Sequence, residues 1–194
     1  TLNCPILSII KSKLIVFTDG FGDFVEKLPM YLKYLIVSFL VICFLLPGIK
    51  SIPPLDRDEA RFSQASKQML EDQNYVVIKF QDELRAKKPI GIYWVQSLSA
   101  YIFGKESITS YRIPNVIAFI TLTLVFSAFV YNIAYRYFDV AFSTAINYSL
   151  LTSILLSIIF GFAIEIKQAK TDSILLMLCT IQQLIFWKIY NYGK

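Results

Sequence analysis

Long uncharged apolar stretches alternate with charged segments along this chain of 194 residues. The uncharged windows cover residues 34–49, 113–135, 140–164 and 173–187. A helix needs roughly 20 residues to cross a hydrocarbon core of about 30 Å, and the middle two windows exceed that length. Lysines beside the outer windows can lengthen these spans, because their long side chains let the ammonium reach the headgroups. The pattern predicts an all-α integral membrane protein with four spans, at about residues 32–50, 113–135, 140–164 and 172–190.

Composition favours the same class and narrows the chemistry. The chain is 56% hydrophobic and 17% charged, outside the usual range of soluble proteins. A soluble helical core is the alternative, but it does not account for two uncharged windows of such length. The net charge of +5 comes from basic residues that flank the apolar windows, so we expect no nucleic-acid partner. The chain has no histidine and its three cysteines are scattered, which leaves acid–base and metal chemistry to carboxylates.

The polar loop, residues 51–111, separates the first two predicted spans and is rich in charge of both signs. More than half of the chain's 14 acidic residues lie in it. Short basic flanks set the expected orientation, because lysine and arginine favour the cytoplasmic side. These flanks precede the first span, separate the second from the third, and follow the fourth. The polar loop and residues 165–171 are therefore predicted to lie outside.

The ends of the chain carry less information. Residues 1–30 are predicted as a leader, either an amphipathic interfacial helix or a disordered or non-native segment. Lys11 and Lys13 interrupt the apolar run of this leader, so we do not predict a membrane span there. The chain opens on Thr1 and ends at Lys194, directly after the fourth predicted span. We therefore expect residues 31–194 to be the N-terminal portion of a longer multi-pass membrane domain.

Two helices and a short extended run are predicted inside the polar loop. Asp56 can cap the first helix, and Glu59 three residues later completes a capping-box pattern. Its apolar face suits a helix lying along the membrane surface. Residues 75–80 are extended. The second helix is predicted to begin at Pro89 and to end at Gly104, and it is apolar nearly all round. We expect it to be half-sunk in the interface or packed on the membrane helices.

Charged residues near the predicted helix ends are the candidate functional groups. Asp58 and Glu59 can accept a proton from an attacking hydroxyl or help to hold a divalent cation. Cationic side chains suited to a phosphate are Arg61, Lys87, Lys88 and Lys170. Asp172 opens the fourth span, so Asp58, Lys88, Lys170 and Asp172 converge if the two outside loops fold together. Each residue also has a structural explanation, since helix N-termini favour acids and lysines bind headgroups.

Residues 55–104 resemble the first extracytoplasmic loop of GT-C-fold glycosyltransferases, which use lipid-linked sugars. The most similar members are bacterial aminoarabinose (lipid A) transferases and the protein O-mannosyltransferase group. The resemblance rests on an ordered set of motifs, here Asp58-Glu59, Arg61-Phe62, Lys88-Pro89 and Tyr93-Trp94. The segment beginning at Lys170, with Asp172 at the start of a span, resembles the second acidic site. The resemblance covers about residues 34–190.

The resemblance implies a multi-pass enzyme of the bacterial inner (plasma) membrane that transfers a hexose or pentose from a polyprenyl-phosphate donor. The acceptor would be a lipid A-like molecule or a protein. Asp58 would be the general base or orient the acceptor, and Arg61 and Lys88 would stabilise the departing phosphate. Glu59 and Asp172 would shape the site or hold a cation. If the acceptor is itself a phosphate, no base is needed. Asp58 would then position the acceptor or help to hold a metal ion.

Family members have more membrane helices and a C-terminal extracytoplasmic domain. This difference leaves a second expectation open, namely a non-catalytic membrane subunit or a truncated remnant of such an enzyme. The partner of an active half would be the missing C-terminal part. A small transporter is less favoured, because its polar residues would be expected in the middle of spans, whereas the acids here lie at span ends.

Overall fold

The structure is a computed structural model that describes residues 28–54, 56–85, 87–136, 138, 141–159 and 164–192. The leader predicted at residues 1–30 lies almost wholly outside the described residues.

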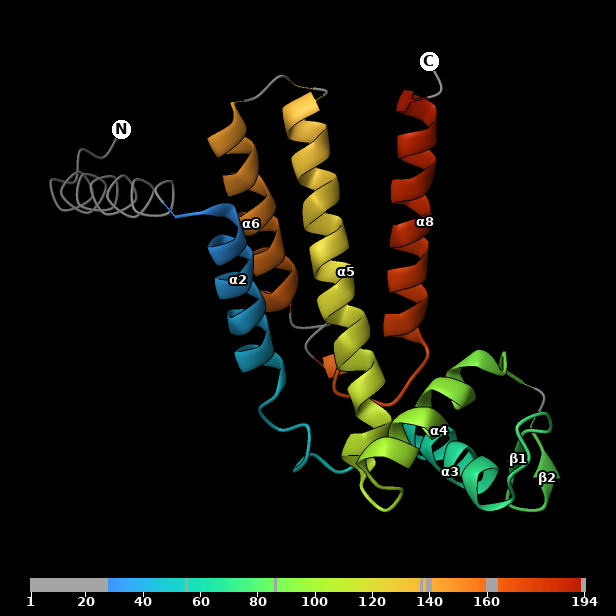
Figure 1. Ribbon diagram of the computed structural model, residues 1–194. Coiled ribbons are helices and arrows are strands. Elements are labelled where there is room, and N and C mark those ends of the chain that lie inside the picture. The colour runs from blue at the N-terminus through green and yellow to red at the C-terminus, as the bar shows by residue number, and fades with distance from the viewer. Residues whose placement is uncertain are drawn as a thin grey trace, which may run out of the picture.

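Long helices stand side by side and form the body of the molecule (Figure 1). They are α2 (Met30–Leu45), α5 (Ile108–Arg136), α6 (Phe142–Ile158) and α8 (Asp172–Tyr192). Their directions alternate along the chain, so the polar loop and residues 164–171 emerge at the same end of the bundle (Figure 1). Helix α5 packs against each of the other three. A buried apolar cluster at their contact includes Val41, Phe119 and Ile146.

Two of the helices are long and apolar enough to cross a membrane. They are α5, with 29 residues, and the segment 172–191 of α8; the most apolar 18-residue window of each has a mean hydropathy of 2.2 and 1.4, respectively. The other two are shorter than the roughly 20 residues of a full span, with 16 residues in α2 and 17 in α6. The structure thus confirms an essentially helical chain with two segments of spanning length. The prediction of four spans stays a prediction.

The predicted first span is too long at its C-terminal end. Helix α2 ends at Leu45, whereas the sequence pattern extended it to residue 50. Pro47 has no N–H and cannot donate the hydrogen bond that would continue the helix. Gly48 then adopts a positive φ of 84° that turns the chain away from the helix. The stop therefore comes from Pro47 and Gly48.

Helices α5 and α6 meet along a seam of small polar residues. The Ser127 hydroxyl donates to the Ser149 carbonyl at 3.0 Å and also contacts the Ser153 hydroxyl. Ala145, which lies in α6 with Ser149 and Ser153, is fully buried. Small side chains let two backbones approach closely, and serine hydroxyls bonded to carbonyls satisfy their polarity without water. This seam therefore suits packing between helices in a membrane as well as in water.

The polar loop folds into α3 (Arg57–Glu71), β1 (Lys79–Phe80), β2 (Glu83–Leu84) and α4 (Gly91–Phe103), grouped at one end of the bundle (Figure 1). Asp56 caps α3 as predicted, since its side chain accepts from the backbone N–H of Asp58 at 3.3 Å. The apolar face of α3 packs against α4 through Phe62 and Tyr93, whose ring centroids are 5.5 Å apart. That face is therefore covered by protein, and the prediction that it lies on the membrane surface is wrong.

A short antiparallel hairpin replaces the single extended run predicted at residues 75–80. Strand β1 pairs with β2 through Lys79 opposite Leu84 and Phe80 opposite Glu83. Gln81 turns the chain at a positive φ of 57°. The Gln68 amide bonds both the N–H and the carbonyl of Gln81, at 3.0 and 2.9 Å. A side chain from α3 thus holds the turn in a conformation that a residue with a β-carbon rarely adopts.

Helix α4 buries Ile92 and Tyr93 against α3 but exposes most of its other large apolar residues. Gln96, Ser97 and Ala100 are at most 1% exposed. The exposed face carries Trp94, Val95, Leu98, Tyr101, Ile102 and Phe103, each at least 43% exposed. This distribution is the reverse of that of a helix on a water-soluble protein. It fits the expectation that α4 packs on the protein with one side and meets a non-aqueous environment with the other.

We predict opposite effects of alanine at the two ends of α4. Gly104 ends the helix with φ 99° and ψ 130°, a conformation available essentially to glycine alone. Gly104→Ala should therefore lower the free energy of unfolding by about 1–3 kcal/mol. Gly91, at the first helical position, has no atom within 4 Å of an added β-carbon, so Gly91→Ala should be neutral or slightly stabilising. Thermal unfolding of both variants in detergent checks this, and equal destabilisation would contradict it.

Candidate functional site

A fully buried ion pair joins α3 to the start of α5. The Nε–H of Arg112 donates to Oε1 of Glu59 at 2.7 Å, and both side chains are 0% exposed. Burying two charges costs several kcal/mol per ion unless each finds hydrogen-bonding partners. The structure supplies such partners on both sides of the pair.

Arg112 also binds the chain just after α2. Its Nη1 donates to the carbonyls of Ile49 and Ile52, at 2.7 Å each, and its Nη2 to Pro53 at 3.4 Å. The planar guanidinium presents five donors in a fixed fork, which lets one side chain satisfy several acceptors at once. Arg112 therefore ties the exit of α2 to the base of α5 and to α3.

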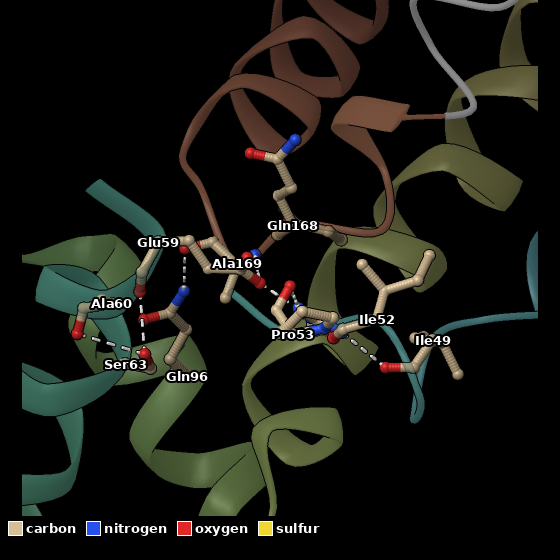
Figure 2. A network of polar contacts seen from close by, with 11 residues as sticks. Ile49, Ile52, Pro53, Glu59, Ala60, Ser63, Gln96, Gln168 and Ala169 are labelled. Carbon is tan, nitrogen blue, oxygen red and sulfur yellow. Dashed lines mark hydrogen bonds and ion pairs between the residues drawn. The ribbon is translucent and has the colours of Figure 1, made fainter. Parts of the chain in front are cut away.

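Glu59 extends the network to the second loop at this end of the bundle. Its Oε1 also accepts the backbone N–H of Ala169 at 3.0 Å. The Ala169 carbonyl accepts from the Gln96 amide at 3.1 Å, and Gln96 is itself held by the Ser66 hydroxyl at 2.8 Å. Figure 2 shows Glu59 of α3, Gln96 of α4 and Ala169 brought together at this point. Segments more than 100 positions apart in sequence are thus fixed against each other.

Lys170 projects from this fixed segment toward the N-terminus of α3. Its ammonium lies 2.9 Å from Oδ2 of Asp56 and 3.7 Å from Oε2 of Glu165. The carboxylate of Asp172, the first residue of α8, also acts electrostatically on it. The polar loop and residues 164–171 therefore meet, and they bring Lys170, with Asp172 beside it, to the start of α3. The carboxylate nearest to Lys170 is Asp56, which the sequence suggested only as a helix cap.

The charges in this pair keep each other ionised. The bond from Lys170 and the N–H of Asp58 lower the pKa of Asp56 below its usual 3.8. Partial burial acts to lower the pKa of Lys170, but the Asp56 bond and the charge of Glu165 outweigh it and raise that pKa above 10.5.

We predict that the Asp56–Lys170 pair is insensitive to pH in the physiological range. A lowered carboxyl pKa contributes stability above the unfolded value and loses it as the pH falls through the folded one. A raised ammonium pKa contributes stability below its unfolded value and loses it as the pH rises through the folded one. Thermal stability of wild type and of Asp56→Asn should therefore differ by a constant amount from pH 5 to 9. A difference that changes steadily within this window would contradict the assignment.

Asp58 and Arg61 occupy the solvent-facing side of α3. Their charged groups are 3.5 Å apart, with 51% of the Asp58 side chain and 44% of the Arg61 side chain exposed. An exposed pair of this kind is held weakly, because water and salt screen it. Both groups are thus accessible to a substrate and free to exchange partners. Asp58 is immediately followed by the buried Glu59, so its backbone is fixed while its side chain stays exposed.

Lys87 and Lys88 lie exposed between β2 and α4. Two residues earlier, Arg85 donates to the Tyr93 hydroxyl at 2.9 Å and stacks over the Phe62 ring at 5.5 Å. This contact fixes the hairpin to α3 and α4 close to Arg61. The two lysines thus follow an anchored residue, and their phosphate-binding role stays a prediction.

Of the residues predicted to hold a cation, Glu59 is already bound by other groups of the protein. Oε1 of Glu59 is occupied by a guanidinium and a backbone N–H inside the protein, an arrangement that satisfies a carboxylate without a metal. Among the described residues no group of three or more histidine, cysteine, aspartate or glutamate side chains is placed to hold a metal ion. Glu59 is thus engaged inside the protein, and the catalytic and metal-binding roles predicted for it stay predictions. Asp58, with a half-exposed side chain, and Asp172, which is exposed, stay candidates.

Residues that sequence reasoning missed hold the site together. Arg112, Gln96 and the Ala169 backbone were not among the predicted residues. Arg112 directly precedes the second predicted span, a position where an arginine commonly anchors a helix to headgroups. A charge at the start of a long apolar helix is a signal that a buried partner exists, but no local pattern identifies Glu59, 53 positions away, as that partner.

The described residues thus form a helical protein with two segments long enough to cross a membrane, and with acidic and basic groups gathered at one end of its helices. Residues 87–193 match the family described as dolichyl-phosphate-mannose-protein mannosyltransferase, and the chain belongs to that family. The matched region contains α4, α5, α6 and α8 together with Lys170 and Asp172. Asp58 and Arg61 precede it, although the resemblance in sequence motifs includes them.

Curated relatives agree with this assignment. An undecaprenyl phosphate-alpha-4-amino-4-deoxy-L-arabinose arabinosyl transferase of Yersinia pestis is 34% identical over 73 residues, covering 38% of this chain and 13% of the relative. The enzyme of the same name from Shewanella sediminis is 26% identical over 105 residues, covering 54% of this chain and 18% of the relative. The matches therefore span less than a fifth of these relatives. No solved structure is detectably similar to the chain.

Proposed function

We propose that this chain forms the donor-binding part of a glycosyltransferase that moves a sugar from polyprenyl phosphate to a lipid A-like or protein acceptor. In this proposal α2, α5, α6 and α8 all span the inner (plasma) membrane of a bacterium, and the polar loop lies on its outer face. The relatives named above are described by their undecaprenyl phosphate-linked aminoarabinose, which supports a lipid-linked donor. The proposal does not specify the sugar, and it includes both a lipid and a protein as acceptor.

The proposed reaction is a displacement at the anomeric carbon. An acceptor oxygen forms a bond to that carbon, the bond from the carbon to the phosphate oxygen breaks, and polyprenyl phosphate leaves. For a hydroxyl acceptor, Asp58 takes the proton, because its exposed carboxylate stands on a fixed backbone at the start of α3. For a phosphate acceptor no proton is moved, and Asp58 orients the acceptor. Asp172, near Lys170, shapes the same site or contributes to a cation site.

Negative charge builds on the departing phosphate, and cations placed beside it lower the barrier. Arg61 is the best placed, since its pairing with Asp58 is exposed and 3.5 Å long. Lys170 contributes by exchanging Asp56 for the phosphate. Lys87 and Lys88, exposed and close in sequence to the anchored Arg85, would be further cations for the phosphate. A phosphate that replaces a carboxylate partner keeps each cation neutralised, so the exchange costs little.

An apolar groove supports a hydrocarbon donor. It has a volume of about 300 Å³ and lies between α4, α5 and α8. Its walls include Val95, Ile102, Ile113, Ile117, Ile174 and Met177. Ile174 lies two residues after Asp172, so the groove begins beside the charged end of α8. A prenyl chain in this groove would bring its phosphate toward the cations.

The observation that carries the proposal is the meeting of Lys170 and Asp172 with the start of α3, in a chain of this family. The test is transfer from a radiolabelled polyprenyl-phosphate sugar in membranes that contain the full-length protein. Label should pass to the lipid fraction or to the protein fraction, and this partition identifies the acceptor. Membranes without the protein are the control. Equal label with and without the protein, despite confirmed insertion, would contradict the proposal and favour a non-catalytic subunit or remnant.

A further inference from the structure

Glu59 is the point where the two loops at the charged end of the molecule are joined. One carboxylate oxygen accepts both the Arg112 guanidinium and the Ala169 N–H. Ala169 is held on its other side as well, because its carbonyl accepts from Gln96. Ala169 is 0% exposed, whereas Lys170, the next residue, is 14% exposed at its side chain. The chain thus passes from a clamped residue directly to a partly buried cation.

A residue clamped at both its N–H and its carbonyl has little freedom of backbone rotation. The direction in which the following side chain leaves the backbone is fixed accordingly. Lys170 leaves toward Asp56, and its ammonium meets Oδ2 there at 2.9 Å. Asp56 belongs to the same end of α3 as Glu59, three residues away. Two separate contacts therefore hold the loop to α3, one buried and central, the other at the surface and exchangeable.

We propose that Glu59 is a positioning residue, which sets the place of the Lys170 ammonium by holding Ala169 against α3 and does not itself touch substrate. This inference rests on the proposed function, in which Lys170 faces the departing phosphate. It gives the acidic pair Asp58-Glu59 two separate tasks. Asp58 faces the reacting groups. Glu59, on the buried side of α3, holds residues 164–171 in place against this helix.

The buried charge is what makes the contact strong. Hydrogen bonds to a charged acceptor are roughly twice as strong as those between neutral groups. Glu59→Gln keeps the shape of the side chain but removes the charge, and places an amide in the midst of the Arg112 donors. The matched control is Glu106→Gln, which removes the same charge from the surface pair with Lys67, 2.7 Å long but with the Glu106 side chain 73% exposed.

Hydrogen exchange tests the positioning without any reference to activity. In the full-length protein, Glu59→Gln should raise the exchange rate of amides in residues 165–170 about tenfold, because the Ala169 N–H loses its charged acceptor. Exchange in the central turns of α5 should stay as in wild type, which shows that the bundle is intact. Glu106→Gln should leave residues 165–170 unchanged. Unchanged exchange in Glu59→Gln would overturn the proposal, whatever the activity.

A double-mutant cycle on transfer then tests whether Glu59 acts through Lys170. We expect Lys170→Met to lower kcat about 100-fold and Glu59→Gln about tenfold, with the donor KM within about twofold of wild type. The variant with both changes should be no slower than Lys170→Met alone, since a lost ammonium no longer needs positioning. A merely structural Glu59 would give losses that multiply, and that result would overturn the proposal. Absence of transfer by wild type would contradict the proposed function, while hydrogen exchange would still decide on the positioning.

Discussion

Arg112→Met is expected to lower the free energy of unfolding by about 3–5 kcal/mol, the largest stability effect at the charged end of the molecule. The change leaves Glu59 buried without its counter-ion. It also leaves the carbonyls of Ile49, Ile52 and Pro53 without the donors that Arg112 supplies. Arg61→Met is the matched control, because Arg61 forms an exposed pair with Asp58, and its loss should cost less than about 1 kcal/mol.

Thermal unfolding of both variants in the same detergent measures this difference. Replacing Glu59 and Arg112 together by Leu and Met should not restore full stability, although apolar pairs often substitute well for buried ion pairs. The three carbonyls that Arg112 binds would still lack partners. Equal stability of Arg112→Met and Arg61→Met would mean that the buried network does not hold this end of the protein.

Asp58→Asn in the full-length enzyme is expected to lower kcat for a hydroxyl acceptor by about 100-fold or more, with membrane insertion intact. An amide keeps the size of the side chain but cannot take a proton, and a positioned base contributes about 10²–10⁴-fold. Asp82→Asn in the turn of the exposed hairpin is the control and should transfer at the wild-type rate. Steady-state transfer at several acceptor concentrations separates kcat from KM. Normal turnover by Asp58→Asn would remove Asp58 from the proposed mechanism.

Local signals in the sequence predicted the helix ends that depend on local chemistry. Asp56 caps α3 through its carboxylate, and Gly104, which has no β-carbon, ends α4 at a positive φ, both as expected. Helix α4 starts at Gly91, two residues after the predicted Pro89, within the usual uncertainty of helix boundaries. The end of α2 was misplaced because the apolar run continues to residue 49, past Pro47. Hydrophobicity alone does not show that the backbone has already turned.

Features that depend on distant partners could not be predicted. The turn at Gln81 exists because Gln68 bonds both its N–H and its carbonyl, and neither residue carries a turn signal. Glu59 reads locally as part of a capping box, yet its Oε1 binds Arg112 and Ala169. Asp58 and Glu59 are adjacent and chemically alike. Only the packing of α3 against the other segments assigns one to the surface and the other to the interior.

The amphipathic pattern of α3 predicted which face is apolar but not what covers it. Phe62, Ala65 and Met69 are buried as expected. Their cover is α4, whose own apolar excess lies on the opposite face. The side that we expect to meet the membrane therefore belongs to α4. A single helix shows the direction of its apolar face, whereas the identity of the covering element comes from the arrangement of several.

The most direct test of the account is the stoichiometry of the products formed by the purified full-length protein in liposomes. The donor would carry one label in its sugar and another in its polyprenyl phosphate. We predict that each sugar that reaches the acceptor is matched by one molecule of released polyprenyl phosphate, and that Asp58→Asn lowers both together. Release of polyprenyl phosphate without transfer, or no turnover by a correctly inserted enzyme, would contradict the claim that this chain carries the donor site of a glycosyltransferase.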